Sequence, residues 1–130
     1  METKRISANI ANGTIHFPNH ETNISSVEWV KHPQFKGVHL KHMIKGSDTN
    51  GLFSSHLVKV DPGCALETHC HDEQMELHEV LEGQGILCLA EETVDYHTGK
   101  FAVTPKGIGH RVEAGKNGLV LLAKFFPALL

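Results

Sequence analysis

Short apolar runs, broken by turn-forming residues, follow one another along the chain from residue 27 onward. Runs of this length are typical of strands rather than helices. Gly, Pro, Asn and Asp cluster between them, and breaks this frequent leave little space for helices. The pattern therefore predicts an all-β fold, a sandwich or barrel in which antiparallel neighbours are joined by tight turns. The predicted strands are residues 27–31, 37–45, 52–60, 75–82, 84–91, 101–104, 109–114 and 119–126.

Glycine pairs mark two of the expected turns, at residues 83–85 and 115–118. Residues 1–26 are richer in Asn, Thr and Ser than the rest and form a polar amino-terminal arm that is not linker-like. A chain of 130 residues has room for one ordinary domain. We therefore expect a single domain over residues 1–130.

Composition and charge narrow the range of partners. The formal net charge is −3, and lysine and arginine form no stripe along the chain. Such a chain lacks the positive surface that binds nucleic acids or anionic lipids, so a small-molecule partner is expected instead. The first residues include no apolar stretch that could act as a secretory signal, which makes a cytoplasmic location the default. Its three cysteines are then expected to be buried thiols.

Histidine is the unusual component, with 11 in the chain. His69 and His71 are two residues apart, and in a strand this spacing directs both imidazoles to one face and Cys70 to the other. After a polar turn, Glu76 and His78 share one face of the next predicted strand. A returning antiparallel strand would bring Glu76 opposite the two histidines.

Two interpretations of this arrangement are open. Two neutral imidazoles and a carboxylate from adjacent strands could hold a divalent transition metal and leave coordination positions free. Alternatively, His69 and His71 are polar residues on a solvated sheet face, with Glu76 as their ion-pair partner. An isolated His-x-His pair would favour the second interpretation, but the glycines and the later histidine that accompany this pair favour the first.

The spacing of these residues resembles the two sequence motifs of the cupin superfamily. The first motif is matched by Gly63, His69, His71, Glu76 and Gly83, and the second by Gly99, Pro105, Gly107 and His110. The second motif ends on Asn in the family, whereas this chain has Ala114 there, a departure that concerns a hydrogen bond at a strand end and not the metal site. The resemblance covers residues 63–114, and the flanking residues carry no motif.

The resemblance implies a small jelly-roll β-barrel with a metal ion inside it. The implied ligands are His69, His71, Glu76 and His110, around one divalent transition metal ion for which iron, manganese, nickel and zinc are all candidates. The superfamily holds dioxygenases, isomerases, decarboxylases and lyases together with proteins that only bind a ligand, so the fold does not select a reaction. We expect an enzyme acting on a small oxygen-rich substrate, such as an organic acid, an enol or a sugar-like compound; the alternative is a non-catalytic ligand-binding or sensing barrel.

His78 has no position in the family motif, yet strand alternation places it beside Glu76. It is the candidate catalytic residue, a general acid or base next to a metal-bound ligand. The structural alternatives are support of a metal ligand, or a histidine satisfied inside the barrel. His56 alternates with Val58 and Val60 and is a further candidate for the interior. No role is expected for the histidines taken as surface or turn residues, which are His16, His20, His32, His39, His42 and His97.

The carboxyl-terminal segment is apolar, with Phe125, Phe126, Leu129 and Leu130 close together. This segment is too short to span a bilayer. An apolar patch of this kind is costly to leave in water, which predicts a homodimer. Alternatively, the tail packs over its own barrel.

Overall fold

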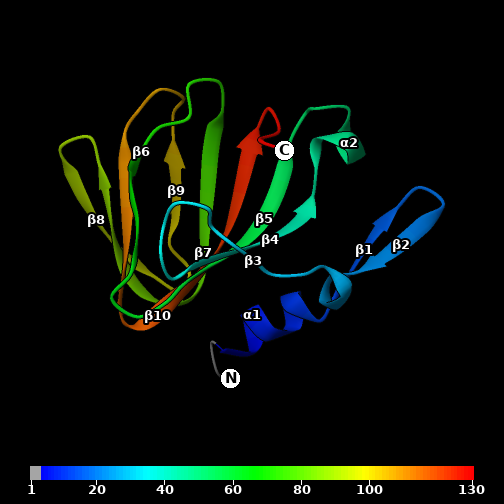
Figure 1. Ribbon diagram of the computed structural model, residues 1–130, viewed down its shortest axis with the longest axis horizontal. Coiled ribbons are helices and arrows are strands. Elements are labelled where there is room, and N and C mark those ends of the chain that lie inside the picture. Colours follow the sequence, from blue (N-terminus) through cyan, green and yellow to red (C-terminus); the bar gives the residue numbers. More distant parts are fainter. Residues whose placement is uncertain (1–3) are drawn as a thin grey trace.

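The computed structural model describes residues 4–130, and strands make up most of them (Figure 1). The all-β prediction is confirmed. The strands after the amino-terminal arm are β3 (Val30–Lys31), β4 (Val38–Ile44), β5 (Ser54–Val60), β6 (Ala65–His69), β7 (Met75–Leu89), β8 (Glu92–His97), β9 (Phe101–Thr104) and β10 (His110–Phe126).

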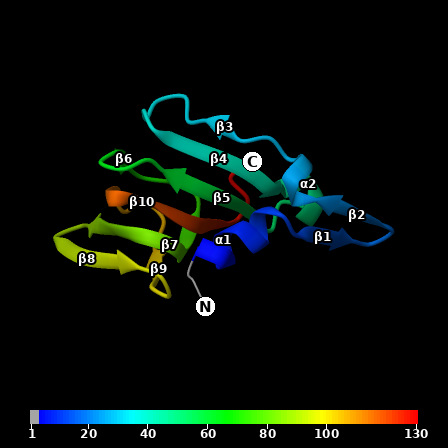
Figure 2. The same ribbon diagram turned by 90° about the horizontal axis from the view of Figure 1, so that it is seen from below.

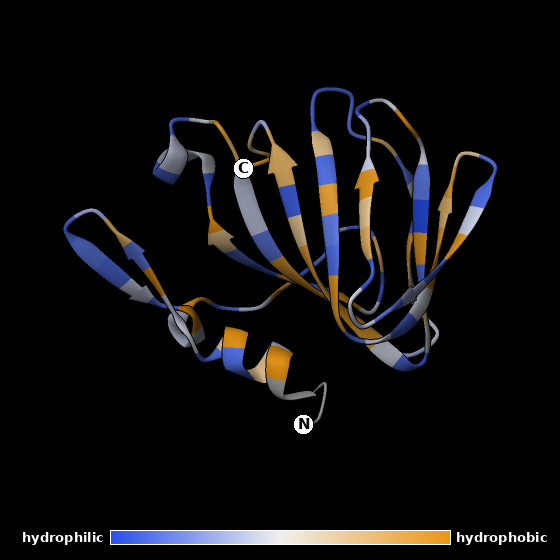
Figure 3. Cartoon of the chain, turned by 180° about the vertical axis from the view of Figure 1, so that it is seen from behind, coloured by the Kyte–Doolittle hydropathy of each residue, from blue (hydrophilic) through white to orange (hydrophobic). Residues whose placement is uncertain are grey.

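These strands form one antiparallel sheet in the order β3-β4-β5-β10-β7-β8. Strand β6 also pairs with β10, and β9 pairs with β7. Figures 1 and 2 show the sheet curling around a common interior. Buried and more exposed residues alternate along much of β7 and β10, and Figure 3 shows hydrophobic and hydrophilic residues interspersed along the strands. Leu87, Val112 and Leu121 are fully buried in the resulting core.

Strands β7 and β10 each run through a position where the sequence predicted a turn. Gly83 and Gly118 have φ angles of 85° and 79°, and a Cβ added to Gly83 would lie 2.1 Å from the carbonyl oxygen of Gly118. The register between the two strands shifts between Ala114 and Leu119, so both bend at the same place and stay paired on either side of it. The turns expected at residues 83–85 and 115–118 are therefore bends within long strands.

The amino-terminal arm contains a helix, which the sequence analysis did not anticipate. Helix α1 (Lys4–Ala11) precedes a hairpin of β1 (Thr14–Phe17) and β2 (His20–Asn23) and a short 3₁₀ turn, Ile24–Ser26. Ile6 and Ile10 have the helical spacing of four residues, but the serine and asparagines around them are weak helix formers. The Ser7 hydroxyl bonds the carboxylate of Glu82, which attaches α1 to β7. Among residues 4–130, no helix has the length and apolar character needed to cross a membrane.

Part of the carboxyl-terminal tail is attached to its own barrel. Phe125 is buried, the amide of Ala128 donates to the carbonyl of Gly51 at 3.0 Å, and the amide of Leu129 donates to Ser54 Oγ at 2.9 Å. Short helix α2 (Gly46–Thr49), where a turn was expected, lies next to this tail, because the amide of Gly46 donates to the carbonyl of Leu130. Phe126, Leu129 and Leu130 remain exposed, so the homodimer stays a prediction.

Candidate metal centre

Three imidazoles and one carboxylate meet inside the barrel. One ligand atom from each side chain lies within 4.8 Å of every other one, so the group could hold a metal ion. The four residues are those that the sequence motifs singled out: His69, His71, Glu76 and His110.

Strand β10 brings these residues together. His110 begins β10 and pairs with His69 at the end of β6, while Glu76 pairs with Phe125 at the far end of β10. The sequence suggested that β6 pairs directly with β7. This is wrong, because each of them pairs with β10 instead. Glu76 still reaches His110, because β10 bends and its two ends face each other across the interior. His71 lies in the loop after β6.

Backbone carbonyls set the orientation of two of the imidazoles. Nδ1–H of His69 donates to the carbonyl of Glu67 at 2.7 Å, and Nδ1–H of His110 donates to the carbonyl of Ile108 at 3.2 Å. In a neutral imidazole this leaves the lone pair on Nε2. Histidines that bind metals commonly have their other ring nitrogen engaged in this way.

Glu76 is buried, and its two carboxylate oxygens differ in their surroundings. Oε2 lies 2.5 Å from Nε2 of His78. Oε1 lies 3.1 Å from Nε2 of His110 and 3.7 Å from Nε2 of His71. Neither Oε1 nor Nε2 of His110 has a well-aligned hydrogen-bond partner among the described residues, although both atoms are buried. Because buried polar atoms are rarely left unpaired, two such atoms facing each other fit a bound cation.

His78 is buried and has both ring nitrogens engaged. Besides its contact with Glu76, its Nδ1 lies 2.8 Å from the hydroxyl of Tyr96. Burial, followed by the nearby charge of Glu76, raises the pKa of Tyr96, so the phenol keeps its proton. The arrangement that satisfies every atom has the phenol donating to Nδ1 and Nε2–H donating to Oε2 of Glu76. This leaves Oε1 free to face the three histidines.

The pKa shifts in the cluster follow from burial and from the carboxylate. Burial by itself raises the pKa of Glu76, but His78 and His110 lower it well below its usual range, so this group is ionised. Burial lowers the pKa values of His69 and His71, which favours the neutral form that binds metals. Burial also lowers the pKa of His110, but the contact with Glu76 outweighs it and raises that pKa.

A cavity of about 90 Å³ adjoins the cluster. The cluster residues His69, His71 and Glu76 line one part of it, and His42 and His56 line another. Its remaining walls come from His32, Leu40, Val58, Leu66, His78, Ala123, Phe125 and Leu129. The interior position of His56 agrees with its alternation along β5. His32 lies in a loop, as expected, whereas His42 lies within β4, and both line the cavity.

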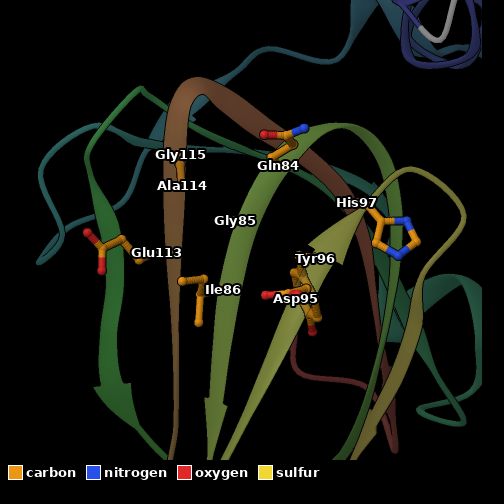
Figure 4. Close-up of a pocket in the computed structure, with 9 residues that line it drawn as sticks. All are labelled: Gln84, Gly85, Ile86, Asp95, Tyr96, His97, Glu113, Ala114 and Gly115. Atoms are coloured by element: carbon orange, nitrogen blue, oxygen red, sulfur yellow. The ribbon is translucent and has the colours of Figure 1, made fainter.

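A larger groove of about 520 Å³ lies elsewhere, across β7, β8 and β10 (Figure 4). Its acidic side chains, Asp95 and Glu113, are exposed to solvent. It therefore lacks the buried, unpaired polar atoms of the smaller cavity, and volume alone does not make it the functional site.

Two further expectations need correction. None of the three cysteines is fully buried: Cys64 and Cys88 are partly buried, and Cys70 is exposed, with its Sγ donating to Asp72 at 3.6 Å. Tyr96, whose hydroxyl bonds His78, was not predicted as a site residue. The strand predicted over residues 84–91 ended before β8, and β8 itself was not predicted. The alternation of Val94 with Tyr96 was the available signal.

The profile of the family described as "Cupin domain" matches residues 56–123. The chain belongs to the cupin family. The matched segment begins at His56, before the first motif, and ends at Ala123, so it includes all four clustered residues. Among curated proteins, no significant match is found.

Solved cupin structures resemble the chain in fold. A cupin from Shewanella frigidimarina has a TM-score of 0.73 and 17% identity, covering 88% of this chain and 93% of that one. A predicted oxalate decarboxylase from Thermotoga maritima has a TM-score of 0.70 and 24% identity, covering 79% and 95%. KdgF from a Halomonas species has a TM-score of 0.69 and 20% identity, covering 79% and 90%. At these identities the similarity establishes the fold alone.

Proposed function

We propose that this cupin binds one divalent transition metal ion through His69, His71, Glu76 and His110. One observation carries the proposal: the ligand atoms of the four side chains lie within 4.8 Å of one another, and in the described part of the chain buried Oε1 of Glu76 and Nε2 of His110 have no aligned hydrogen bond. Three neutral imidazoles and one carboxylate would leave a site charge near +1 around a divalent ion. The mixed nitrogen and oxygen set suits iron, manganese, nickel or zinc, and availability rather than the donors selects among them.

We further propose that the protein is an enzyme acting on a small oxygen-rich substrate, such as an organic acid, an enol or a sugar-like compound. A bound ion of this kind supplies Lewis acidity to an oxygen of the substrate. Phe125 and Leu129 line the cavity and give it apolar surface beside the proposed ion. The Thermotoga maritima neighbour is described as a predicted oxalate decarboxylase, a reaction that falls within this class.

The engagement of His78 favours a second candidate function, ligand binding without chemistry. A general base needs a nitrogen within reach of the substrate. Both nitrogens of His78 are occupied, one by Glu76 and one by Tyr96. These contacts support a positioning role, in which His78 holds the carboxylate in place and keeps Oε1 directed at the ion.

Elemental analysis of natively purified protein, followed by a turnover screen, tests both proposals. We expect close to one metal ion per chain, removed by a chelator and restored on reloading. A screen of small acids, enols and sugars is then run with loaded, metal-free and reloaded protein. Turnover that follows the metal content supports the enzyme; tight binding without turnover supports the second candidate. Protein that takes up no ion when reloaded would refute the metal centre.

We also propose a homodimer, which the apolar side chains left exposed on β7 and β9 support. Strand β9 leaves Phe101 and Val103 62% and 56% exposed on the outer face of the sheet, beside Met75 of β7 at 44%. Apolar side chains gathered on one sheet face favour association. Light scattering should show a dimer that Phe101→Glu dissociates. A monomer at all concentrations would refute the dimer.

A further inference from the structure

Residues 127–130, the end of the carboxyl-terminal tail, contribute one residue to the wall of the cavity beside the metal cluster. Leu129 lines this cavity and is also 38% exposed, more than any other residue of the lining. A residue that contacts both the cavity and the solvent separates the two. Figure 1 shows the tail turning back beside the end of β10. Leu129 therefore stands where the cavity opens to solvent.

Hydrogen bonds fix the backbone at this position. The amide of Leu129 donates to Ser54 Oγ at 2.9 Å. Ser54 is fully buried, and its hydroxyl also bonds Nε2 of His56 at 2.9 Å, so this anchor is itself held in place. On either side of Leu129, the tail bonds residues in and directly after helix α2. The ends of a chain are poorly ordered unless they are tied down, and these bonds give the Leu129 side chain a defined place.

The tail also bonds the loop that carries His71. Nε2 of Gln74, three residues after His71, donates to the carbonyl of Ala128 at 3.3 Å. The ring of Phe125, which precedes the tail residues, packs edge-on against the ring of His71 with a centroid distance of 5.0 Å. The tail therefore connects β5 to the loop of the metal cluster, and Leu129 lies in this connection.

The cavity has room for a compact ligand only. Its volume is about 90 Å³, far below the roughly 300–1,000 Å³ of sites for drug-sized ligands. A ligand that binds the metal cluster and extends toward solvent on this side meets the isobutyl group of Leu129. Because this group offers no hydrogen bond, its effect on a ligand comes from the space that it occupies. A branched hydrocarbon chain would have to displace the group, whereas a compact acid would not.

We propose that Leu129 is a specificity-determining residue of the metal centre, which admits compact acids and excludes acids with a branched apolar chain on the solvent side. The hydrogen bonds of the tail keep Leu129 in the position where it has this effect. The proposal rests on the metal centre proposed above. It adds an upper limit of size to the oxygen-rich substrates of that centre.

Calorimetric titration of metal-loaded protein with two monocarboxylic acids tests this assignment. Acetate is the compact probe. 3-Methylbutanoate is acetate with an added isopropyl group, which is the group that Leu129→Ala removes from the protein. Leu130→Ala is the matched control, because it removes the same group from the next residue, which is 54% exposed and does not line the cavity. The metal content and the melting temperature of each variant are measured first.

Wild-type protein and Leu130→Ala should both bind acetate at least roughly 10-fold more tightly than 3-methylbutanoate, because the added group overlaps Leu129. In Leu129→Ala, binding of 3-methylbutanoate should improve roughly 10- to 100-fold, the effect of burying three additional carbon atoms. Acetate does not reach the vacated space, so its affinity should change less than about threefold. We expect all three proteins to take up the same amount of metal.

Three results would overturn the assignment: equally tight binding of both acids by wild type, a gain in Leu129→Ala no larger than in Leu130→Ala, or no binding of either acid by metal-loaded protein. If wild-type protein takes up no metal, the proposed metal centre fails separately. The opening is then probed on metal-free protein by the rate at which diethyl pyrocarbonate modifies His71, which lines the cavity, with exposed His97 as the internal standard. Faster modification in Leu129→Ala than in Leu130→Ala supports a barrier at Leu129, and equal rates refute it.

Discussion

Two histidine-rich walls line the same small cavity and differ in how their nitrogens are satisfied. On the wall that carries His69, His71 and Glu76, Oε1 of Glu76 lies 3.1 Å from Nε2 of His110, and neither buried atom has an aligned hydrogen-bond partner among residues 4–130. On the wall from β4 and β5, both nitrogens of His56 are paired, one with Ser54 and one with His42. The unpaired atoms of the first wall are therefore suited to binding a cation. The ring nitrogens of His56 on the second wall are already hydrogen-bonded.

The contrast shows that the number of histidines does not define a metal site. A carboxylate among imidazoles, with ring nitrogens turned inward by backbone carbonyls, makes the first wall electron-rich at one point. The second wall lacks a carboxylate, and its imidazoles bond to each other and to a hydroxyl. Metal binding should therefore depend on the first wall alone.

The largest expected effect comes from Glu76→Gln, which removes the one negative charge of the cluster. Metal affinity should fall more than 100-fold, beyond the 10- to 100-fold typical when a residue supporting a ligand is lost. His42→Asn, on the other wall, should leave metal affinity within twofold. Competition titration against a chelator of known affinity measures both. Equal losses in the two variants would break the distinction between the walls.

His78→Gln tests whether His78 positions Glu76 or transfers protons. Because its nitrogens bond Glu76 and Tyr96, we expect metal affinity to fall roughly 10- to 100-fold, the effect of losing support for a ligand. Reloading at saturating metal should then restore most function. If metal affinity is unchanged while turnover falls roughly 10²- to 10⁴-fold, His78 is a general acid or base instead. A variant unchanged in both would make His78 an ordinary barrel residue.

His56, on the second wall, should make the stability of the folded protein depend on pH. Burial, with a smaller contribution from His42, lowers the pKa of His56 to about 4 from 6.5. Between these values the unfolded chain binds the proton and the folded chain does not, so the free energy of unfolding falls as pH falls through this window. Allowing for partial burial, His56 should contribute on the order of 2 kcal/mol to that fall.

Urea denaturation of metal-free protein at pH 7.5 and 4.5 measures this contribution. His56→Gln should lose less stability between the two pH values than wild type does, by that amount. His97→Gln, at an exposed histidine, serves as the control and should behave like wild type. Identical losses in wild type and in His56→Gln would show that His56 is protonated without cost in the folded protein.

The ligands of the first wall were predictable from the sequence because their residue types and spacing form a recognisable motif. The partners around them were not, because they depend on how the sheet closes. His42 alternates with Val38 and Leu40, which share its face of β4, yet alternation along one strand does not say whether that face meets His56 or solvent. The bend of β10, which brings His110 to Glu76, likewise lies outside any single strand's pattern.

Tyr96 escaped prediction for a local reason. Strand β7 ends at Leu89 and pairs with Glu92 of β8, so the loop is Ala90 and Glu91 alone. Ala90 has a φ angle of 52°, a left-handed conformation usually taken there by glycine or asparagine. Without those residues the hairpin signal is absent, and β8 with its tyrosine was not recognised as a strand.

The smallest effect is expected from Tyr96→Phe. This variant tests whether Tyr96 and His78 support Glu76 as one connected chain of hydrogen bonds. The change removes the hydroxyl that bonds Nδ1 of His78 and keeps the buried ring. A hydrogen bond of this kind contributes about 0.5–1.5 kcal/mol, so metal affinity should fall roughly 2- to 12-fold. If Tyr96 acts through His78, combining the change with His78→Gln should weaken metal binding no further than His78→Gln alone. Chelator competition on the two single variants and the double variant measures this coupling. Additive losses would mean that Tyr96 reaches the metal centre by another route, and that the contacts from Tyr96 through His78 to Glu76 do not act as one unit.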